Sequence, residues 1–104
     1  MKQLLDKTAE AIENAKTTFP EFPDVEWAND IKMIIEELET VTNQAMESEE
    51  PFWFLREKVF DALIEALNNI ISRHISEVDI NICGNVLSIV LAGDRVVERI
   101  WRRV

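Results

Sequence analysis

Apolar residues recur every three or four positions through most of the first three quarters of the chain. In residues 3–17 this spacing predicts an amphipathic helix of about four turns, with Leu5 and Ile12 on its apolar side. The next segment, residues 19–23, contains two prolines, and each removes a backbone donor and disfavours helical geometry in the residue before it. We therefore expect a connector there, anchored by its two phenylalanines.

Two longer helices are predicted after this connector. The first starts at Asp24 as its N-cap and continues for more than five turns, because apolar side chains keep helical spacing over residues 27–45. The second follows residues 48–51, where a proline suits a first helical turn. It is expected to start near residue 50, to end within residues 74–76, and to be the central helix because its apolar face is broad.

The last 27 residues show a different period. Val78, Ile80 and Ile82 alternate with other residues, which is strand spacing, and Gly84-Asn85 and Gly93-Asp94 are two-residue turn candidates. Pairing outward from both turns places apolar residues at eight of the nine positions on one face. The pattern predicts a three-stranded antiparallel β-meander whose apolar face packs on the helices.

The final segment has an alternative interpretation. Residues 95–104 also fit a helix with Asp94 as its cap, and periodicity alone does not decide between helix and strand. With the strand preferred, the predicted fold class is α+β. It is a single domain of residues 1–104, helical over 1–76 and a β-meander over 77–104.

The charge is concentrated in one half of the chain. Of 20 Asp and Glu residues, 13 lie in residues 1–50, against four Lys, whereas residues 51–104 hold seven acidic and seven basic residues. The whole net charge of −9 therefore belongs to the first half. Such a potential repels nucleic acid and anionic lipid, so we expect a basic protein partner and neither direct nucleic-acid binding nor membrane binding.

The residues that carry most metal and cofactor chemistry are scarce. One His and one Cys cannot make a four-ligand zinc site, and two glycines are too few for a phosphate-binding loop. The calcium-loop-like start at Asp79 would need an acidic ligand at its twelfth position, where Val90 stands. His74 and Cys83 are too separated in the predicted fold to form a nucleophile and its base. We therefore predict no metal, no cofactor and no enzymatic activity.

Two apolar features exceed what a core needs. Residues 52–55 are all apolar and span about 300° on a helix, so one aromatic side chain, Trp53, is expected to be exposed as a binding anchor. The outer face of the meander would expose four further large apolar residues. These are the predicted self-association residues of a homodimer: Val86, Val90, Val97 and Trp101.

The lone Cys83 cannot form an internal disulfide, and no unbroken apolar run exceeds four residues. Acidic residues also interrupt the start of the chain, where a signal peptide needs an apolar stretch. We expect a cytoplasmic protein.

These features favour a small acidic inhibitor that masks a basic surface of a nucleic-acid-acting protein such as a nuclease. Immunity proteins, antitoxins and anti-defence inhibitors form that functional class. The alternative is a homo-oligomeric structural or adaptor protein that uses the outer face of the meander. The predicted partner-binding residues of the inhibitor are Asp6, Glu10, Glu13, Glu36, Glu37, Glu39, Glu47 and Trp53.

Overall fold

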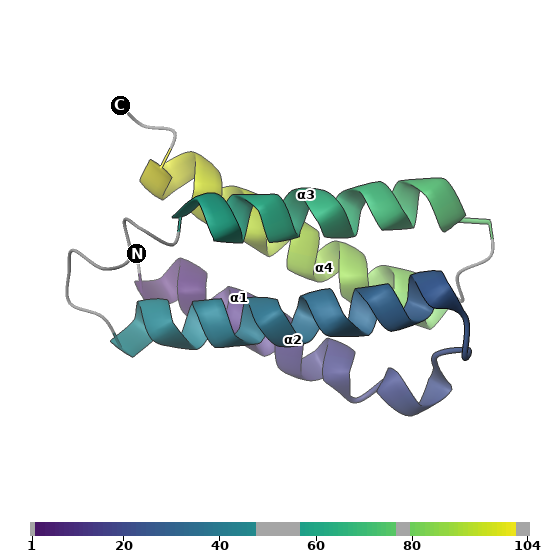
Figure 1. Cartoon of the computed structure of the whole chain (residues 1–104). Helices are drawn as coiled ribbons and strands as arrows, with labels where there is room; N and C mark the ends of the chain where they lie inside the picture. Colours follow the sequence, from purple (N-terminus) through teal and green to yellow (C-terminus); the bar gives the residue numbers. More distant parts are fainter. Residues whose placement is uncertain (1, 48–56, 77–79, 102–104) are drawn as a thin grey trace.

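The computed structural model describes residues 2–47, 57–76 and 80–101, and in these ranges the chain is helical with short connections and no strand. Four α-helices account for most of these residues (Figure 1). In chain order the elements are α1 (Lys2–Lys16), the 3₁₀-helix η1 (Phe19–Glu21), α2 (Glu26–Glu47), α3 (Glu57–His74), α4 (Ile80–Val96) and the π-helix η3 (Val97–Trp101).

The four helices form an antiparallel bundle. Helices α1 and α3 start at the end of the bundle where α2 and α4 finish (Figure 1). Helix α1 packs on α2 and α4, and α3 packs on the same two helices. The helices therefore surround the core in the order α1, α2, α3 and α4, and each is covered by its two neighbours. In the view of Figure 1 they form two layers, α1 with α2 and α3 with α4.

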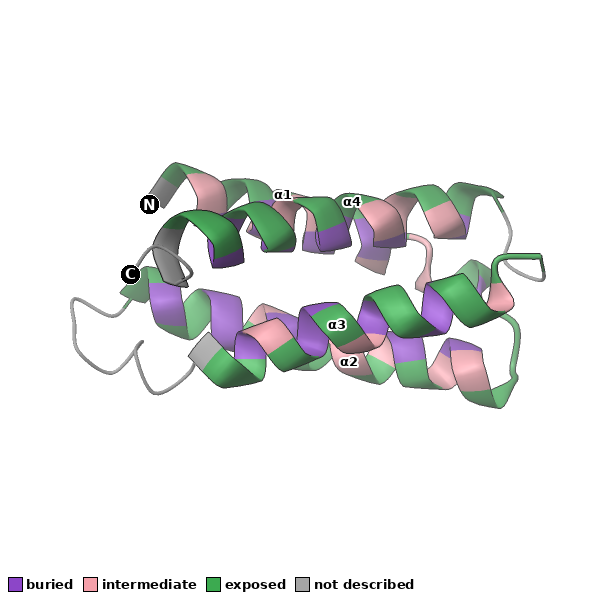
Figure 2. Cartoon of the chain, turned by 90° about the horizontal axis from the view of Figure 1, so that it is seen from above, coloured by how far each residue is buried: buried purple, intermediate pink, exposed green. Residues whose placement is uncertain are grey.

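The core is continuous along the bundle axis. Every helix turns its buried residues inward, and its exposed residues form the opposite side (Figure 2). Ile35, Leu38, Phe60 and Leu67 are among the side chains that are completely buried. Each such side chain contributes roughly 1.5–3 kcal/mol by leaving water, so the shared core supplies the main stabilisation of the fold.

The helices expected in the first three quarters of the chain are confirmed. Helix α1 matches the helix expected over residues 3–17, and α2 is the helix of more than five turns. Between them, Phe19 and Phe22 meet edge to face with ring centroids 5.4 Å apart, so the proline-rich connector is anchored by both aromatics. Helix α3 ends at His74 as expected, while its expected start near residue 50 lies outside the described residues.

The predicted β-meander over 77–104, and with it the α+β fold class, is wrong. Residues 80–96 form α4, and the alternative of a helical final segment fits over residues 95–101. The reason is visible in the buried residues: Ile82, Val86, Ile89 and Val90 follow spacings of four, three and one, which places them on one side of a helix. The alternation of Val78, Ile80 and Ile82 covers only three apolar residues, so it is weaker evidence for a strand than this repeat is for a helix.

Both glycines read as turn residues lie inside α4. Gly84 is exposed, with open space where a side chain would begin. Gly93 is buried, and a Cβ atom there would lie 2.7 Å from Cγ1 of Ile64 and in contact with its Cδ1. The missing side chain of Gly93 therefore lets α4 approach α3 closely.

The stretch Ile80–Arg99 is long and apolar enough, by length and composition, to cross a membrane. Counting only unbroken apolar runs did not reveal it. In the structure α4 packs against α1 and α3 and buries Ile82, Val86 and Ile89 between them. A central bundle helix has the same composition as a membrane span, so this feature alone does not indicate one.

Two threonine hydroxyls are buried in the bundle and differ in their partners. The Thr8 hydroxyl donates a hydrogen bond of 2.9 Å to the backbone carbonyl of Leu4. The Thr42 hydroxyl has no hydrogen-bond partner among the residues that the structure describes. A buried hydroxyl gives up its hydrogen bonds to water, and without a protein partner nothing replaces them. The Thr42 hydroxyl therefore lowers the stability of the fold.

The two glycines of α4 predict opposite effects of one substitution. Gly93→Ala should lower the free energy of unfolding by about 1–2 kcal/mol, because the clash with Ile64 outweighs the gain in helix propensity. Gly84→Ala should raise it by about 0.5–1 kcal/mol, since no atom crowds that position. Urea unfolding of both variants measures these changes, and a stabilising Gly93→Ala would contradict the close approach.

The two threonines provide a second matched pair. Thr42→Val should raise the free energy of unfolding by about 1 kcal/mol, because it removes an uncompensated hydroxyl. Thr8→Val should lower it by about 0.5 kcal/mol, since a hydrogen bond is lost. Thermal unfolding followed by circular dichroism compares them, and equal signs for the two variants would refute this account of Thr42.

Candidate functional site

The acidic first half of the chain forms one layer of the bundle, and the second half forms the other layer. Residues 2–47, which form α1, η1 and α2, contain eleven acidic residues and four lysines. The described parts of α3, α4 and η3 contain five acidic and four basic residues. One layer of the bundle is therefore strongly acidic, and the other is nearly neutral.

The acidic layer presents a row of exposed carboxylates. On α1 they occur at three- and four-residue spacing, so they share one side of that helix. On α2, Glu36 and Glu47 are separated by three helical turns and also share a side. We call this surface the α1–α2 acidic face, and its exposed residues are Asp6, Glu10, Glu13, Glu36 and Glu47.

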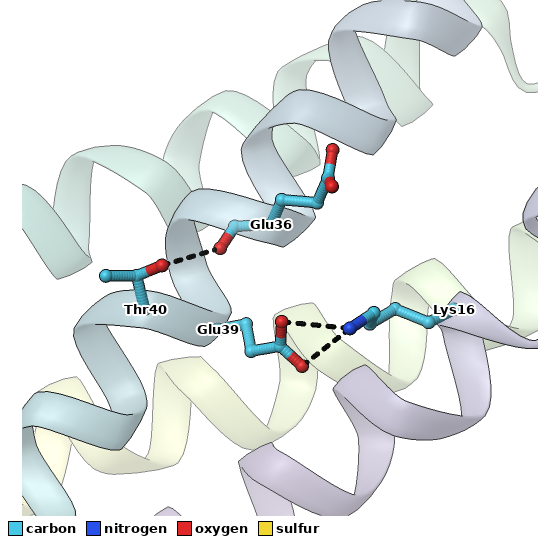
Figure 3. A network of polar contacts seen from close by, with 4 residues as sticks. All are labelled: Lys16, Glu36, Glu39 and Thr40. Carbon is cyan, nitrogen blue, oxygen red and sulfur yellow. Dashed lines mark hydrogen bonds and ion pairs between the residues drawn. The ribbon is translucent and has the colours of Figure 1, made fainter.

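A two-pronged contact joins the two helices of this face. The Lys16 ammonium donates to both carboxylate oxygens of Glu39, each at 2.9 Å (Figure 3). The side chains of Lys16 and Glu39 are 35% and 25% exposed, so this ion pair sits in the seam between the helices. Glu39 therefore serves as a bridge from α2 to α1, and its charge is already balanced inside the chain.

The acidic surroundings change the ionisation of Lys16. The hydrogen bond with Glu39 is the largest cause that raises its pKa above the ordinary value of 10.5. Partial loss of hydration opposes this rise, while attraction to the carboxylates of Glu39, Glu13 and Glu36 adds to it. The same effects show that carboxylates from both helices gather around one cation.

The remaining predicted contact residues do not all join this surface. Glu37 is exposed, but it follows Glu36 by 100° around α2, so it lies on the flank nearer α3. Trp53 lies outside the described residues, so its predicted role as an anchor stays a prediction. Of the eight predicted partner-binding residues, five form the exposed face and Glu39 forms its internal bridge.

The predicted self-association surface has no counterpart in the bundle. Val86, Val90 and Val97 are buried in the core, with exposed fractions of 4% or less, because α4 and η3 turn them inward. The side chain of Trp101 lies outside the described residues. A homodimer interface on the outer face of a meander is therefore ruled out by the same finding that corrects the fold.

One aromatic contact was not foreseen in the sequence. The rings of Trp27 and His74 stack with centroids 5.4 Å apart and planes 14° apart, which joins the first turn of α2 to the last turn of α3. Both residues are half-buried. They are 47 positions apart in the chain, so no local pattern could have paired them.

Three exposed aliphatic residues lie at the end of the bundle that holds this stack. Val25 precedes α2, Ile75 follows His74, and Ile80 opens α4, and all three are exposed. Helical periodicity could have identified Ile80 as a surface residue only if a helix starting at that residue had been predicted.

Among the residues that the structure describes, no group of three or more His, Cys, Asp or Glu side chains could hold a metal ion. Comparisons with protein-family models, curated proteins and solved structures found no match to this chain.

The bridge between α1 and α2 predicts a pH-dependent stability difference. Because folding raises the pKa of Lys16, its contribution is complete below pH 10.5 and is lost as the pH rises through the higher pKa of the folded state. Lys16→Met should therefore be less stable than the parent chain at neutral pH and similar to it above that range. Urea unfolding of both proteins from pH 7 to 11.5 tests this, and a constant difference would contradict it.

Proposed function

We propose that the chain is a non-catalytic protein-binding inhibitor that masks a basic surface of a nucleic-acid-acting protein, as immunity proteins, antitoxins and anti-defence inhibitors do. The observation that carries this proposal is the separation of charge between the two layers of the bundle. Eleven acidic residues against four lysines lie in the α1–α2 layer, while the other layer is close to neutral. A face of one sign selects a partner surface of the opposite sign.

The geometry of the acidic face suits such a partner. Asp6, Glu10 and Glu13 lie on one side of a helix, with rises of about 6 Å and 4.5 Å between them along its axis. Lysine and arginine side chains in a nucleic-acid cleft are arranged to meet phosphates, and fixed carboxylates can occupy the same positions. Bound in this way, the inhibitor would compete with nucleic acid for the cleft.

The charge would also raise the rate at which such a complex forms. Attraction between an acidic face and a basic cleft raises association rates above the 10⁵–10⁶ M⁻¹s⁻¹ that is typical of neutral surfaces. The effect weakens as salt rises, since the screening length falls to about 8 Å at physiological ionic strength. Salt dependence is therefore the property that distinguishes this mode of binding.

The internal bridge gives the residues of this face different roles. Glu39 is held by Lys16, so it contributes by fixing α2 against α1 and keeping both rows of carboxylates in place. Glu13 and Glu36 lie close enough to raise the pKa of Lys16, yet both are exposed to a partner. We expect Asp6, Glu10, Glu13, Glu36 and Glu47 to make the direct contacts, with Glu37 reached only by a partner that extends toward α3.

Charge reversal on matched positions tests the proposal. The tagged chain is first used to capture a basic partner from the source cells at low salt, and the purified pair is then studied by calorimetry. Glu10→Lys with Glu36→Lys should weaken binding at least tenfold, since both residues lie on the acidic face. The partner's action on nucleic acid should be inhibited by the parent chain and much less by this variant.

The control makes the same change of net charge in the other layer. Glu65→Lys with Glu98→Lys alters exposed residues of α3 and η3 and should leave binding nearly unchanged. Equal losses in the two double variants would mean that only net charge matters, which would refute a specific acidic face. The proposal also fails if no basic protein is captured at low salt and released at high salt.

A further inference from the structure

The end of the bundle where α2 begins and α3 ends carries three exposed aliphatic side chains. Val25, Ile75 and Ile80 are 40%, 58% and 87% exposed. We call these three residues the apolar tip. The other large apolar residues exposed in the described part of the chain are spread over α2, α3 and α4: Met33, Met46, Val59 and Leu91.

The Trp27–His74 stack brings two parts of the tip together. Val25 lies two residues before Trp27, and Ile75 directly follows His74, so both are within one turn of the stacked rings. Ile80 begins α4 at the same end of the bundle (Figure 1). Val25 and Ile75 are thus close in the chain to the two stacked residues, and Ile80 adds a third exposed aliphatic side chain at the same end of the bundle.

The charges around the tip are mostly negative. Glu21 in η1, Asp24 before α2, and Glu26 and Asp30 within α2 are all exposed, and these segments lie at the end of the bundle where α2 begins. Lys16, the last residue of α1, lies at the same end and is paired with Glu39. The basic residues of the last turn of α3 are Arg73 and His74. An aliphatic surface bordered by carboxylates complements a cationic segment that also carries apolar side chains.

The α1–α2 acidic face alone lacks an apolar anchor. No large apolar side chain in the described part of α1 is exposed. Electrostatic attraction speeds encounter, but slow dissociation usually depends on a few apolar or aromatic side chains that are removed from water in the complex. The tip supplies such side chains at the end of the layer that carries the charge.

We infer that the apolar tip is the anchoring part of the docking surface, and that it binds a cationic segment of the protein partner that places an aliphatic or aromatic side chain between lysines or arginines. This inference rests on the proposed function. A second copy of this acidic chain and an anionic lipid surface would both be repelled by the same carboxylates.

Two peptides of identical composition test the inference directly. Both are 18-residue chains of Leu and Lys; one is ordered as an amphipathic helix, and the other is scrambled. Each is titrated into the ¹⁵N-labelled full chain and followed by NMR. We expect the amphipathic peptide to bind at least tenfold more tightly, with its largest shift changes at Val25, Trp27, Ile75 and Ile80.

Matched serine substitutions localise the site. Ile75→Ser with Ile80→Ser should weaken binding of the amphipathic peptide at least tenfold, since it removes exposed side chains of the tip. Met33→Ser with Leu91→Ser removes side chains that are 67% and 60% exposed elsewhere, and it should leave binding unchanged. All four residues are exposed, so both variants should fold like the parent chain.

The outcomes separate this inference from the proposed function. If both peptides bind equally, or the tip variant binds like the parent, the inference is overturned, whereas loss in Glu10→Lys with Glu36→Lys would still support the acidic face. If the tip binds the peptide but that charge-reversed variant keeps full affinity for the natural partner, the acidic-face proposal fails instead. Self-association through the tip, or its binding to anionic vesicles, would also overturn the inference.

Discussion

The burial of one apolar stripe on each of four helices is the constraint on which the rest of this structure depends. Helix α4 shows it most clearly, because its residues 80–92 include no charged side chain and its inward side is covered by α1 and α3. The antiparallel order lets the chain pass from each helix to a neighbour in the bundle, and α1 and α4, the helices farthest apart in the chain, pack on each other to close it. The charged residues then lie on the outer surface, and the half of the chain that contains them determines the layer in which they lie.

Much of the helical layer structure could be predicted from the sequence, because local rules govern it. Helical spacing identified α1 and α2, and the two prolines of the connector marked the break between them. The acidic residues of the first half were also recognised as surface residues, and five of them do form one exposed face. Contacts between distant residues could not be predicted in this way: Lys16 pairs with Glu39 across 23 positions, and no periodic pattern records that choice.

The prediction of a β-meander in the last quarter of the chain was wrong for a physical reason. A glycine followed by Asn or Asp favours a tight turn only where the chain reverses, and inside a helix the same glycine can instead serve close packing. A turn at Gly84 and another at Gly93 would place Val86, Val90 and Val97 on an outer sheet face. In the bundle these valines lie on the inward side of α4 and η3, so residues predicted to be on the surface are part of the core.

The close approach of the helices at Gly93 makes the residues allowed at positions 64 and 93 depend on each other. Ile64 fills the space that a side chain at position 93 would need, so the two residues share one volume between α3 and α4. A sequence that carries alanine at position 93 would therefore be compatible with a shorter residue, such as valine, at position 64. The effects of changing both residues should not be the sum of the separate effects, since either one limits what the other can become. The distance between α3 and α4 at this point therefore depends on positions 64 and 93 together, and on neither residue alone.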